Sequence, residues 1–322
     1  MRSAGVLVVA LVAPLALEAC KAPEPSARAS TGAARGSAKS TPPVPAARSA
    51  AASASASTAA PTSAPLASTR TELAIAPAPP PAAPALAPLD GPEMLSFKLD
   101  DGGEAFVVVP LGATSPRPVI LGVHGAGDRH DWSCVEWQAS ARRYPFVVCP
   151  RGVPTSKEFY AWGSPDLIVK RAEKALALVK DRYPAYVADG PVLYGGWSQG
   201  AMLTAQVVSA RPGLFERVIM IEIGHTPLDA NGVGFGLKTG AVTRAVVSCS
   251  SPPCRGKSRE LAKTLPRYGV AVEQNDVGDR GHWFDDPVFK TLGPKIGWVT
   301  EGDPRWDGLR DILAREDGDA GP

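Results

Sequence analysis

The residues with the clearest chemistry lie in the pentapeptide Gly196-Trp197-Ser198-Gln199-Gly200. An apolar stretch over 191–195 precedes the serine and predicts a strand, and a helix is predicted over 199–210. A serine between two glycines suits a strained strand-to-helix turn, because the glycines let the two elements approach while the hydroxyl is pushed out above them. Ser198 is therefore a candidate nucleophile, which needs a base to accept its proton.

A second motif, His124-Gly125-Ala126-Gly127, comes directly after an apolar run. This motif resembles the oxyanion loop of lipases and esterases, and the serine motif resembles their nucleophile turn. Both classes of enzyme belong to the α/β-hydrolase superfamily. The resemblance implies that the backbone amides of Ala126 and Gln199 stabilise an oxyanion, and that His124 shapes the loop and is not the base. The alternative is a glycine-rich strand end without a catalytic role.

Two of the four histidines, His225 and His282, follow Ser198 in the chain. The family places its residues in the order serine, acid, histidine. The resemblance therefore assigns the base to His282, which lies in a glycine-flanked segment after the last predicted strand. His225 follows an earlier strand, at a point where the family would place an acid.

The acid is harder to assign. Most family members carry it after the strand predicted here over 243–248, but residues 249–255 contain no carboxylate. A pancreatic-lipase-like variant carries it after the preceding strand, where Glu222 stands in an apolar run. A buried carboxylate without a partner is costly, so we take Glu222 as the acid, paired with His282.

Two rivals for the acid remain open at this point. Asp279 is very near His282 in sequence, and Asp276 is close by. Each is equally consistent with an ordinary solvated loop charge.

Aromatic residues near the motifs are candidates to line a substrate pocket. Trp197 is the strongest, because it adjoins Ser198, and Trp162 and Tyr160 are weaker. Aromatic side chains of this kind more often belong to the core.

The elements that must position these residues follow an alternating order. A hairpin is predicted over 96–110 around Asp100-Asp101-Gly102-Gly103. Strands are predicted over 118–124, 146–149, 191–195, 217–223, 243–248 and 270–277, and helices over 167–183, 199–210 and 257–267. This order predicts an α/β fold, the α/β-hydrolase fold, with a mostly parallel central sheet and helices on both faces. Only about twenty residues separate 223 from 243, which is too short for a large cap domain and favours an open cleft.

The N-terminal part of the chain has a different composition. Arg2 and the apolar run Val6–Leu17 are typical of a signal peptide, and Leu17-Glu18-Ala19-Cys20 resembles a bacterial lipobox despite the unusual Glu18. We therefore expect residues 1–20 to be a lipoprotein-type signal, with Cys20 lipidated and anchored to a membrane of the cell envelope. A plain signal peptide and a secreted protein are the alternative.

Residues 21–90 are rich in Ala, Pro and Ser, and the first ninety residues contain no aromatic side chain. Such a stretch cannot bury enough apolar surface to offset its ordering entropy, so we expect a disordered tether. The core must then lie in a hydrolase domain over 91–322.

The cysteines are consistent with export to an oxidising compartment. If Cys20 carries lipid, Cys134, Cys149, Cys249 and Cys254 remain. An even number suggests two disulfides, and of three pairings we favour Cys134–Cys149 and Cys249–Cys254. Four buried free thiols are the alternative.

These features predict a serine hydrolase that cleaves carboxylic esters, with a small-molecule or lipid-like ester as substrate. The alternatives are a surface binding protein that keeps the fold without turnover, which the missing acid suggests, and a peptidase on the same fold. The net charge of +2 gives no support for nucleic-acid binding. The sequence has no dinucleotide or P-loop fingerprint and no zinc-ligand spacing, so we expect neither a cofactor nor a metal.

Overall fold

A computed structural model of the protein describes residues 85–224 and 227–319. The expected signal peptide, Cys20 and nearly all of the expected tether lie outside this part of the chain, as does His225. The lipid anchor, export and the domain limits therefore stay predictions.

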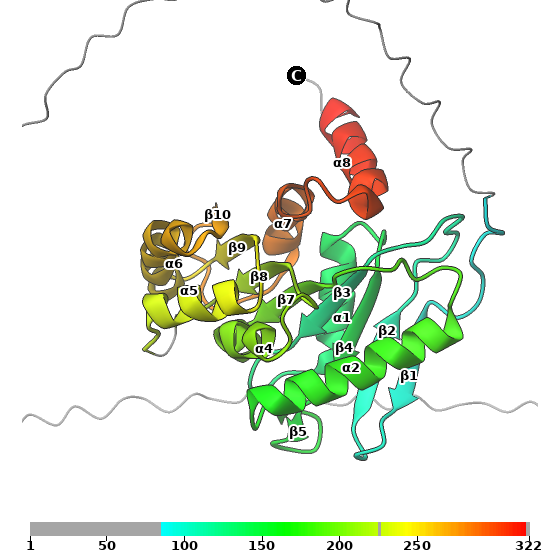
Figure 1. Ribbon diagram of the computed structural model, residues 1–322, viewed down its shortest axis with the longest axis horizontal. Helices are drawn as coiled ribbons and strands as arrows, with labels where there is room; N and C mark the ends of the chain where they lie inside the picture. Colours follow the sequence, from blue (N-terminus) through cyan, green and yellow to red (C-terminus); the bar gives the residue numbers. More distant parts are fainter. Residues whose placement is uncertain (1–84, 225–226, 320–322) are drawn as a thin grey trace, which may run out of the picture. The chain divides into compact units, whose positions relative to one another are not determined.

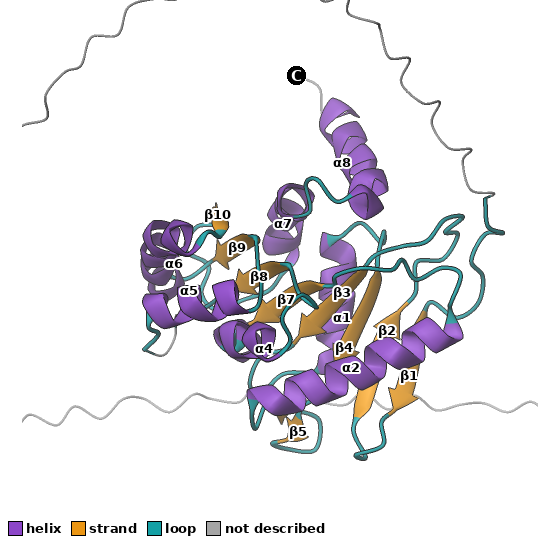
Figure 2. Cartoon of the chain, viewed as in Figure 1, coloured by secondary structure: helices purple, strands orange, loops and turns teal. Residues whose placement is uncertain are grey.

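The described residues form an eight-stranded mixed sheet in the order β1-β2-β4-β3-β7-β8-β9-β10 (Figures 1 and 2). The strands are β1 (Met94–Lys98), β2 (Glu104–Val108), β3 (Val119–Val123), β4 (Phe146–Pro150), β7 (Leu193–Trp197), β8 (Arg217–Ile221), β9 (Arg244–Cys249) and β10 (Ala271–Asp276). β1 and β2 form the predicted antiparallel hairpin, β2 pairs antiparallel with β4, and the remaining neighbours are parallel. A separate two-stranded hairpin joins β5 (Val153–Pro154) to β6 (Tyr160–Ala161).

Helices cover both faces of the sheet. They are α1 (His130–Ser140), α2 (Pro165–Arg182), α3 (Gln199–Met202), α4 (Thr204–Ala210), α5 (Ala230–Thr239), α6 (Pro252–Thr264), α7 (Asp286–Val299) and α8 (Asp307–Asp319), with short 3₁₀ turns η1 (Leu265–Tyr268) and η2 (Pro304–Trp306). In Figure 1, α2, α4, α5 and α6 lie along one face of the sheet, and α1 and α7 lie on the other. This confirms the predicted fold class.

Alternation along the buried strands builds one core on each face. Val218 and Met220 of β8 pack into the core beneath α2, α4 and α6, whereas Ile219 and Ile221 pack into the core beneath α1 and α7. A strand buried on both faces reads as a continuous apolar run, and this is why these strands are visible in the sequence.

The structure also contains helices that the sequence analysis did not predict: α1, α5, α7 and α8. α5 lies in the glycine-rich stretch between β8 and β9. Asp229 caps it by accepting hydrogen bonds from the Asn231 and Gly232 N–H groups, both at 3.0 Å. At Gly236 a β-carbon would lie 2.8 Å from the Ala205 carbonyl oxygen, so this glycine lets α5 pack closely on α4. The predicted helix over 199–210 is divided at Leu203 into α3 and α4.

Both favoured disulfide pairings are present. Cys134–Cys149 joins α1 to β4, and Cys249–Cys254 joins the end of β9 to the first turn of α6. In the described part of the chain, no helix is long and apolar enough to cross a membrane.

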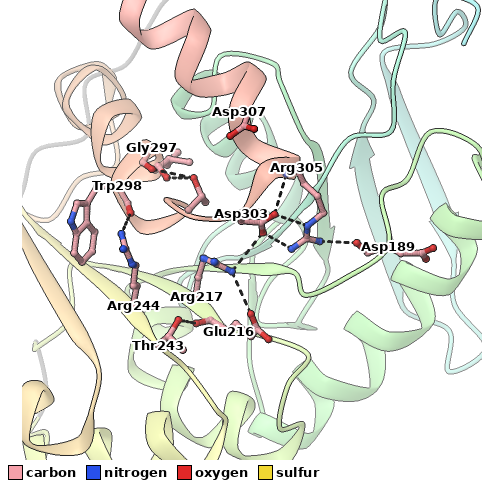
Figure 3. A network of polar contacts seen from close by, with 12 residues as sticks. Asp189, Glu216, Arg217, Thr243, Arg244, Gly297, Trp298, Asp303, Arg305 and Asp307 are labelled. Carbon is pink, nitrogen blue, oxygen red and sulfur yellow. Dashed lines mark hydrogen bonds and ion pairs between the residues drawn. The ribbon is translucent and has the colours of Figure 1, made fainter. Parts of the chain in front are cut away.

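A polar network at the N-terminal ends of the parallel strands, the ends away from Ser198, ties the C-terminal segment to the strands (Figure 3). The buried Asp303 carboxylate accepts hydrogen bonds from Arg305 at 2.9 and 2.6 Å, and Arg217 at the start of β8 lies 3.6 Å away. Burial would by itself raise the pKa of Asp303, but hydrogen bonds from Arg305 and the charges of Arg305 and Arg217 outweigh it and lower the pKa.

We expect Asp303→Asn to lower the free energy of unfolding at pH 7 by about 3 kcal/mol, because it breaks a buried ion pair. A lowered folded-state pKa stabilises the protein above the unfolded pKa of about 3.9, and this contribution is lost as pH falls through the folded value. Urea unfolding of wild type and variant at several pH values should therefore show their difference shrinking below about pH 4. A difference independent of pH would contradict this account.

Candidate active site

Ser198 stands on a strained turn between β7 and α3. Its backbone is left-handed, with φ of 51°, and its N–H donates to the Ile221 carbonyl at 2.8 Å. Glycines make the turn possible: a β-carbon at Gly196 would lie 2.6 Å from the backbone of Gly200, and one at Gly200 would lie 2.3 Å from the Val123 carbonyl oxygen. A non-glycine residue at positive φ is costly and is found mainly where function needs it.

The loop between β10 and α7 brings His282 to the serine. Its Nε2 lies 2.9 Å from Ser198 Oγ, and its Nδ1 lies 3.3 Å from Glu222 Oε2. The Trp197 ring stacks on the imidazole, with ring centroids 5.3 Å apart and planes inclined by 29°. The three residues predicted as nucleophile, base and acid are therefore in contact, and Trp197 lies beside them.

Glu222 repeats the geometry of Ser198 one strand further along the sheet. It directly follows β8, not inside the strand as its apolar run suggested, with φ of 56° and an N–H that donates to the Ser248 carbonyl at 2.9 Å. Its side chain is fully buried. Oε1 accepts from the N–H of Ser250 and lies 3.0 Å from Ser250 Oγ, and Oε2 accepts from Ser251 Oγ at 2.5 Å. The carboxylate is thus satisfied by hydrogen bonds, as a buried charge requires.

The two rival carboxylates lie elsewhere. Asp276 and Asp279 are mostly exposed and lie 3.6 and 3.7 Å from Arg255. Within residues 85–224 and 227–319, neither aspartate contacts His282. Glu222 is therefore the one of the three candidates that reaches the imidazole.

The His124 loop has the arrangement that a neutral histidine requires. His124 is fully buried, and burial lowers its pKa to about 4. Its Nε2 accepts from the Gly152 N–H at 3.0 Å, so the ring proton is on Nδ1 and donates to the Gly125 carbonyl at 2.7 Å. Both ring nitrogens of His124 are used, one by the Gly125 carbonyl and one by the Gly152 N–H after β4, and Ser198 is not among the described hydrogen-bond partners of the ring.

The predicted oxyanion donors flank the serine. Gln199 is the first residue of α3, and Ala126 lies in the turn that follows β3. No hydrogen bond between described residues uses either backbone N–H, so both are available to a ligand. Gly125 packs against this turn, where a β-carbon would lie 2.6 Å from the Trp197 ring and 3.1 Å from Ser198 Cβ.

Side chains brace this loop through contacts that the sequence analysis did not predict. The Gln199 amide accepts from the Trp162 N–H at 2.8 Å and donates to the Trp162 carbonyl at 3.0 Å. The buried Trp162 indole stacks on His124 and donates to its carbonyl at 3.0 Å. Asp128 Oδ2 accepts from the Gly125 N–H at 3.4 Å, and burial raises the pKa of Asp128 to about 6. Trp162 is therefore part of the scaffold, and Tyr160 contributes backbone hydrogen bonds to Gly127 and Asp128.

Within the described ranges, no group of three or more His, Cys, Asp or Glu side chains could hold a metal ion. The described residues of this site offer a serine hydroxyl, an imidazole, a buried carboxylate and two backbone amides.

The strand order, the helices on both faces of the sheet and the strained turn that carries Ser198 between β7 and α3 match an α/β-hydrolase fold. No family model matches the chain, and no curated protein matches it. Among solved structures it is similar to a thermostable esterase, with 18% identity, a TM-score of 0.43 and coverage of 65% of this chain and 62% of that one. It is also similar to a ferulic acid esterase (14%, 0.48, 64% and 96%) and to a carboxylesterase from Mesorhizobium loti (16%, 0.47, 64% and 99%). Similarities at these identities and TM-scores say nothing about the activity of this chain.

Proposed function

We propose that the protein is a serine hydrolase that cleaves carboxylic esters through an acyl-enzyme on Ser198. The observation that carries this is the continuous contact from Ser198 Oγ through His282 to Glu222, with distances of 2.9 and 3.3 Å. A nucleophile, a base and an orienting carboxylate in this order are the parts that acyl transfer needs.

In the first half-reaction, His282 Nε2 takes the Ser198 proton as Oγ attacks the ester carbonyl. The oxyanion that forms accepts hydrogen bonds from the N–H groups of Ala126 and Gln199, which are preorganised by the Trp162 and His124 contacts. His282 then passes its proton to the leaving alcohol, and the acyl group stays on Ser198.

In the second half-reaction, water replaces the alcohol. His282 takes a proton from the water molecule as the water oxygen attacks the acyl carbon. It then gives that proton to Ser198 Oγ as the carboxylic acid product leaves. Through both half-reactions Glu222 accepts a hydrogen bond from the Nδ1–H of His282 and stabilises the imidazolium.

A non-catalytic protein was an alternative because no carboxylate follows β9. Glu222 follows β8 and contacts His282, so a carboxylate is present beside the imidazole although none follows β9. This contact supports the enzyme over the binding protein.

The test is stopped-flow hydrolysis of p-nitrophenyl acetate and butyrate by the purified protein, with a peptide p-nitroanilide in parallel. We expect an initial burst of about one p-nitrophenolate per enzyme molecule, followed by slower turnover of the esters, and little release from the anilide. Absence of turnover with every ester would overturn the proposal, and preferential release from the anilide would favour a peptidase.

A further inference from the structure

The segment after β9 has the sequence Cys249-Ser250-Ser251-Pro252-Pro253-Cys254, which we call the 249–254 loop. Most α/β hydrolases carry their acid after this strand, and the loop contains no carboxylate. Its two serines instead contact the carboxylate that lies across from them at the end of β8.

We propose that the 249–254 loop is the positioning element of the acid: Ser250 and Ser251 fix the Glu222 carboxylate against His282, and the Cys249–Cys254 disulfide fixes the two serines. The inference rests on the proposed function and specifies how its site is held. Ser250 and Ser251 are positioning residues, because they act through Glu222.

Each carboxylate oxygen has its own serine. Oε1 accepts from the Ser250 N–H, and Oε2 accepts from Ser251 Oγ at 2.5 Å while facing His282 Nδ1 at 3.3 Å. These bonds oppose rotation of the carboxylate, and by stabilising the charged form they keep it ionised in a buried place. Without them, the energetic cost of burying Glu222 would favour another rotamer or the protonated acid.

Ser250 also joins the acid to the loop that carries the base. Its hydroxyl lies 3.0 Å from Glu222 Oε1 and 2.8 Å from the carbonyl oxygen of Gly281, the residue before His282. One hydroxyl proton serves one of these acceptors at a time, and the Ser250 N–H bonds Glu222 in either case. Ser250 therefore couples the position of the carboxylate to that of the imidazole.

The prolines explain why the Ser251 hydroxyl is not needed as a helix cap. Ser251 is the N-cap of α6, where a serine usually accepts a hydrogen bond from an N–H in the first turn, yet its side chain makes no such bond. Pro252 and Pro253 have no N–H, so the first two helical positions need no cap. The Ser251 hydroxyl is used on Glu222 instead, and the positive end of the helix dipole lies beside the same carboxylate.

The disulfide closes this short loop at both ends. Cys249 is the last residue of β9 and Cys254 lies in the first turn of α6, and both are buried. The chain-entropy account gives a disulfide less stabilising effect as the loop it closes shortens. The Cys134–Cys149 bond closes the longer loop, with a sequence separation of 15 against 5. The short bond is therefore suited to local orientation, and the long one serves as its matched control.

The first experiment compares Ser251→Ala with Ser251→Thr in ester hydrolysis. We expect S251A to lower kcat roughly 10- to 100-fold, as displacement of a catalytic group does, with KM little changed because the Ser251 side chain is buried and bonds the Glu222 carboxylate. S251T keeps a hydroxyl and should recover most of the loss. Wild-type kcat in S251A would overturn the proposal, and so would an S251T that is as slow as S251A.

The second experiment compares the double variants Cys249→Ala/Cys254→Ala and Cys134→Ala/Cys149→Ala. The first pair should lower kcat about tenfold through misplacement of the acid, with the smaller loss in Tm. The control pair should keep kcat within about twofold and show the larger loss in Tm. Equal kcat values in the two double variants, at a temperature where both are folded, would overturn the proposal.

A spectroscopic readout separates this proposal from the proposed function. The Nδ1 proton that His282 shares with Glu222 should give a far-downfield proton NMR signal, assigned by its loss in His282→Gln. We expect the signal to broaden or disappear in S251A and in the Cys249/Cys254 variant, and to persist in the Cys134/Cys149 variant. An unchanged signal in S251A would contradict positioning, whereas failure of the proposed function would appear as a wild-type protein that has the signal but cleaves no ester.

Discussion

Glu222→Gln is expected to lower kcat for ester hydrolysis by about 10³- to 10⁴-fold, with KM nearly unchanged. Glutamine has almost the shape of glutamate, but it cannot stabilise an imidazolium. Its NH₂ group would also face either the Ser250 N–H or the His282 Nδ1–H, both of which need an acceptor. The measurement is steady-state hydrolysis of a p-nitrophenyl ester by folded wild type and variant.

The matched controls are Asp276→Asn and Asp279→Asn. Both carboxylates are exposed beside Arg255, so each variant should keep kcat within about twofold, since exposed ion pairs contribute little. Near-normal activity in E222Q, or a large loss in either aspartate variant, would move the acid away from Glu222.

The second large effect is expected for Ser198→Ala, which should reduce kcat by about 10⁴-fold or more and leave the residual rate that the oxyanion donors provide. Alanine keeps the β-carbon at a φ of 51°, so the strain of the turn is unchanged. Thermal unfolding should therefore give similar Tm values for S198A and wild type.

Ser198→Gly adds a test of that strain. Glycine removes the steric cost of the left-handed backbone, which is about 1–3 kcal/mol. It also lowers stability by about 0.4–1 kcal/mol, because it raises the conformational entropy of the unfolded chain. We expect S198G to be inactive and more stable than S198A by about 1 kcal/mol, measured by urea unfolding. A less stable S198G would show that the turn is not strained.

The site is arranged around one repeated local structure. Ser198 and Glu222 both follow the end of a parallel strand, both have positive φ, and both donate their N–H to the neighbouring strand. Two turns of this kind on adjacent strands aim a hydroxyl and a carboxylate at the same imidazole. The fold thus provides two of the three groups rigidly and leaves His282 on a loop.

The sequence singles out residues that the structure places in contact, and it does so where the signal is local or where burying an unpaired charge would be costly. The glycines around Ser198 indicate a tight turn because their spacing is itself the steric requirement. Glu222 could be predicted to contact His282 because one carboxylate in an apolar run must have a partner, and the two side chains lie 3.3 Å apart. The strands were visible because strands buried on both faces are apolar throughout.

The features that could not be predicted depend on contacts between distant segments. Ser250 and Ser251 look like ordinary turn residues until the fold brings β8 beside β9. Gln199 and Trp162 are 37 residues apart, and nothing in the sequence around either residue indicates that they bond to each other. α5 has three glycines within it, which disfavour a helix, and is stabilised by its Asp229 cap and by close packing on α4.

The most direct test of the central claim is to treat the protein with a fluorophosphonate probe and locate the adduct by peptide mass spectrometry. Such a probe reacts with a serine that is activated by a base. The account predicts about one adduct per molecule, on Ser198 alone, with labelling abolished in S198A and slowed strongly in His282→Gln. An intact, folded protein that takes up no probe, or that carries it on another residue, would contradict the account.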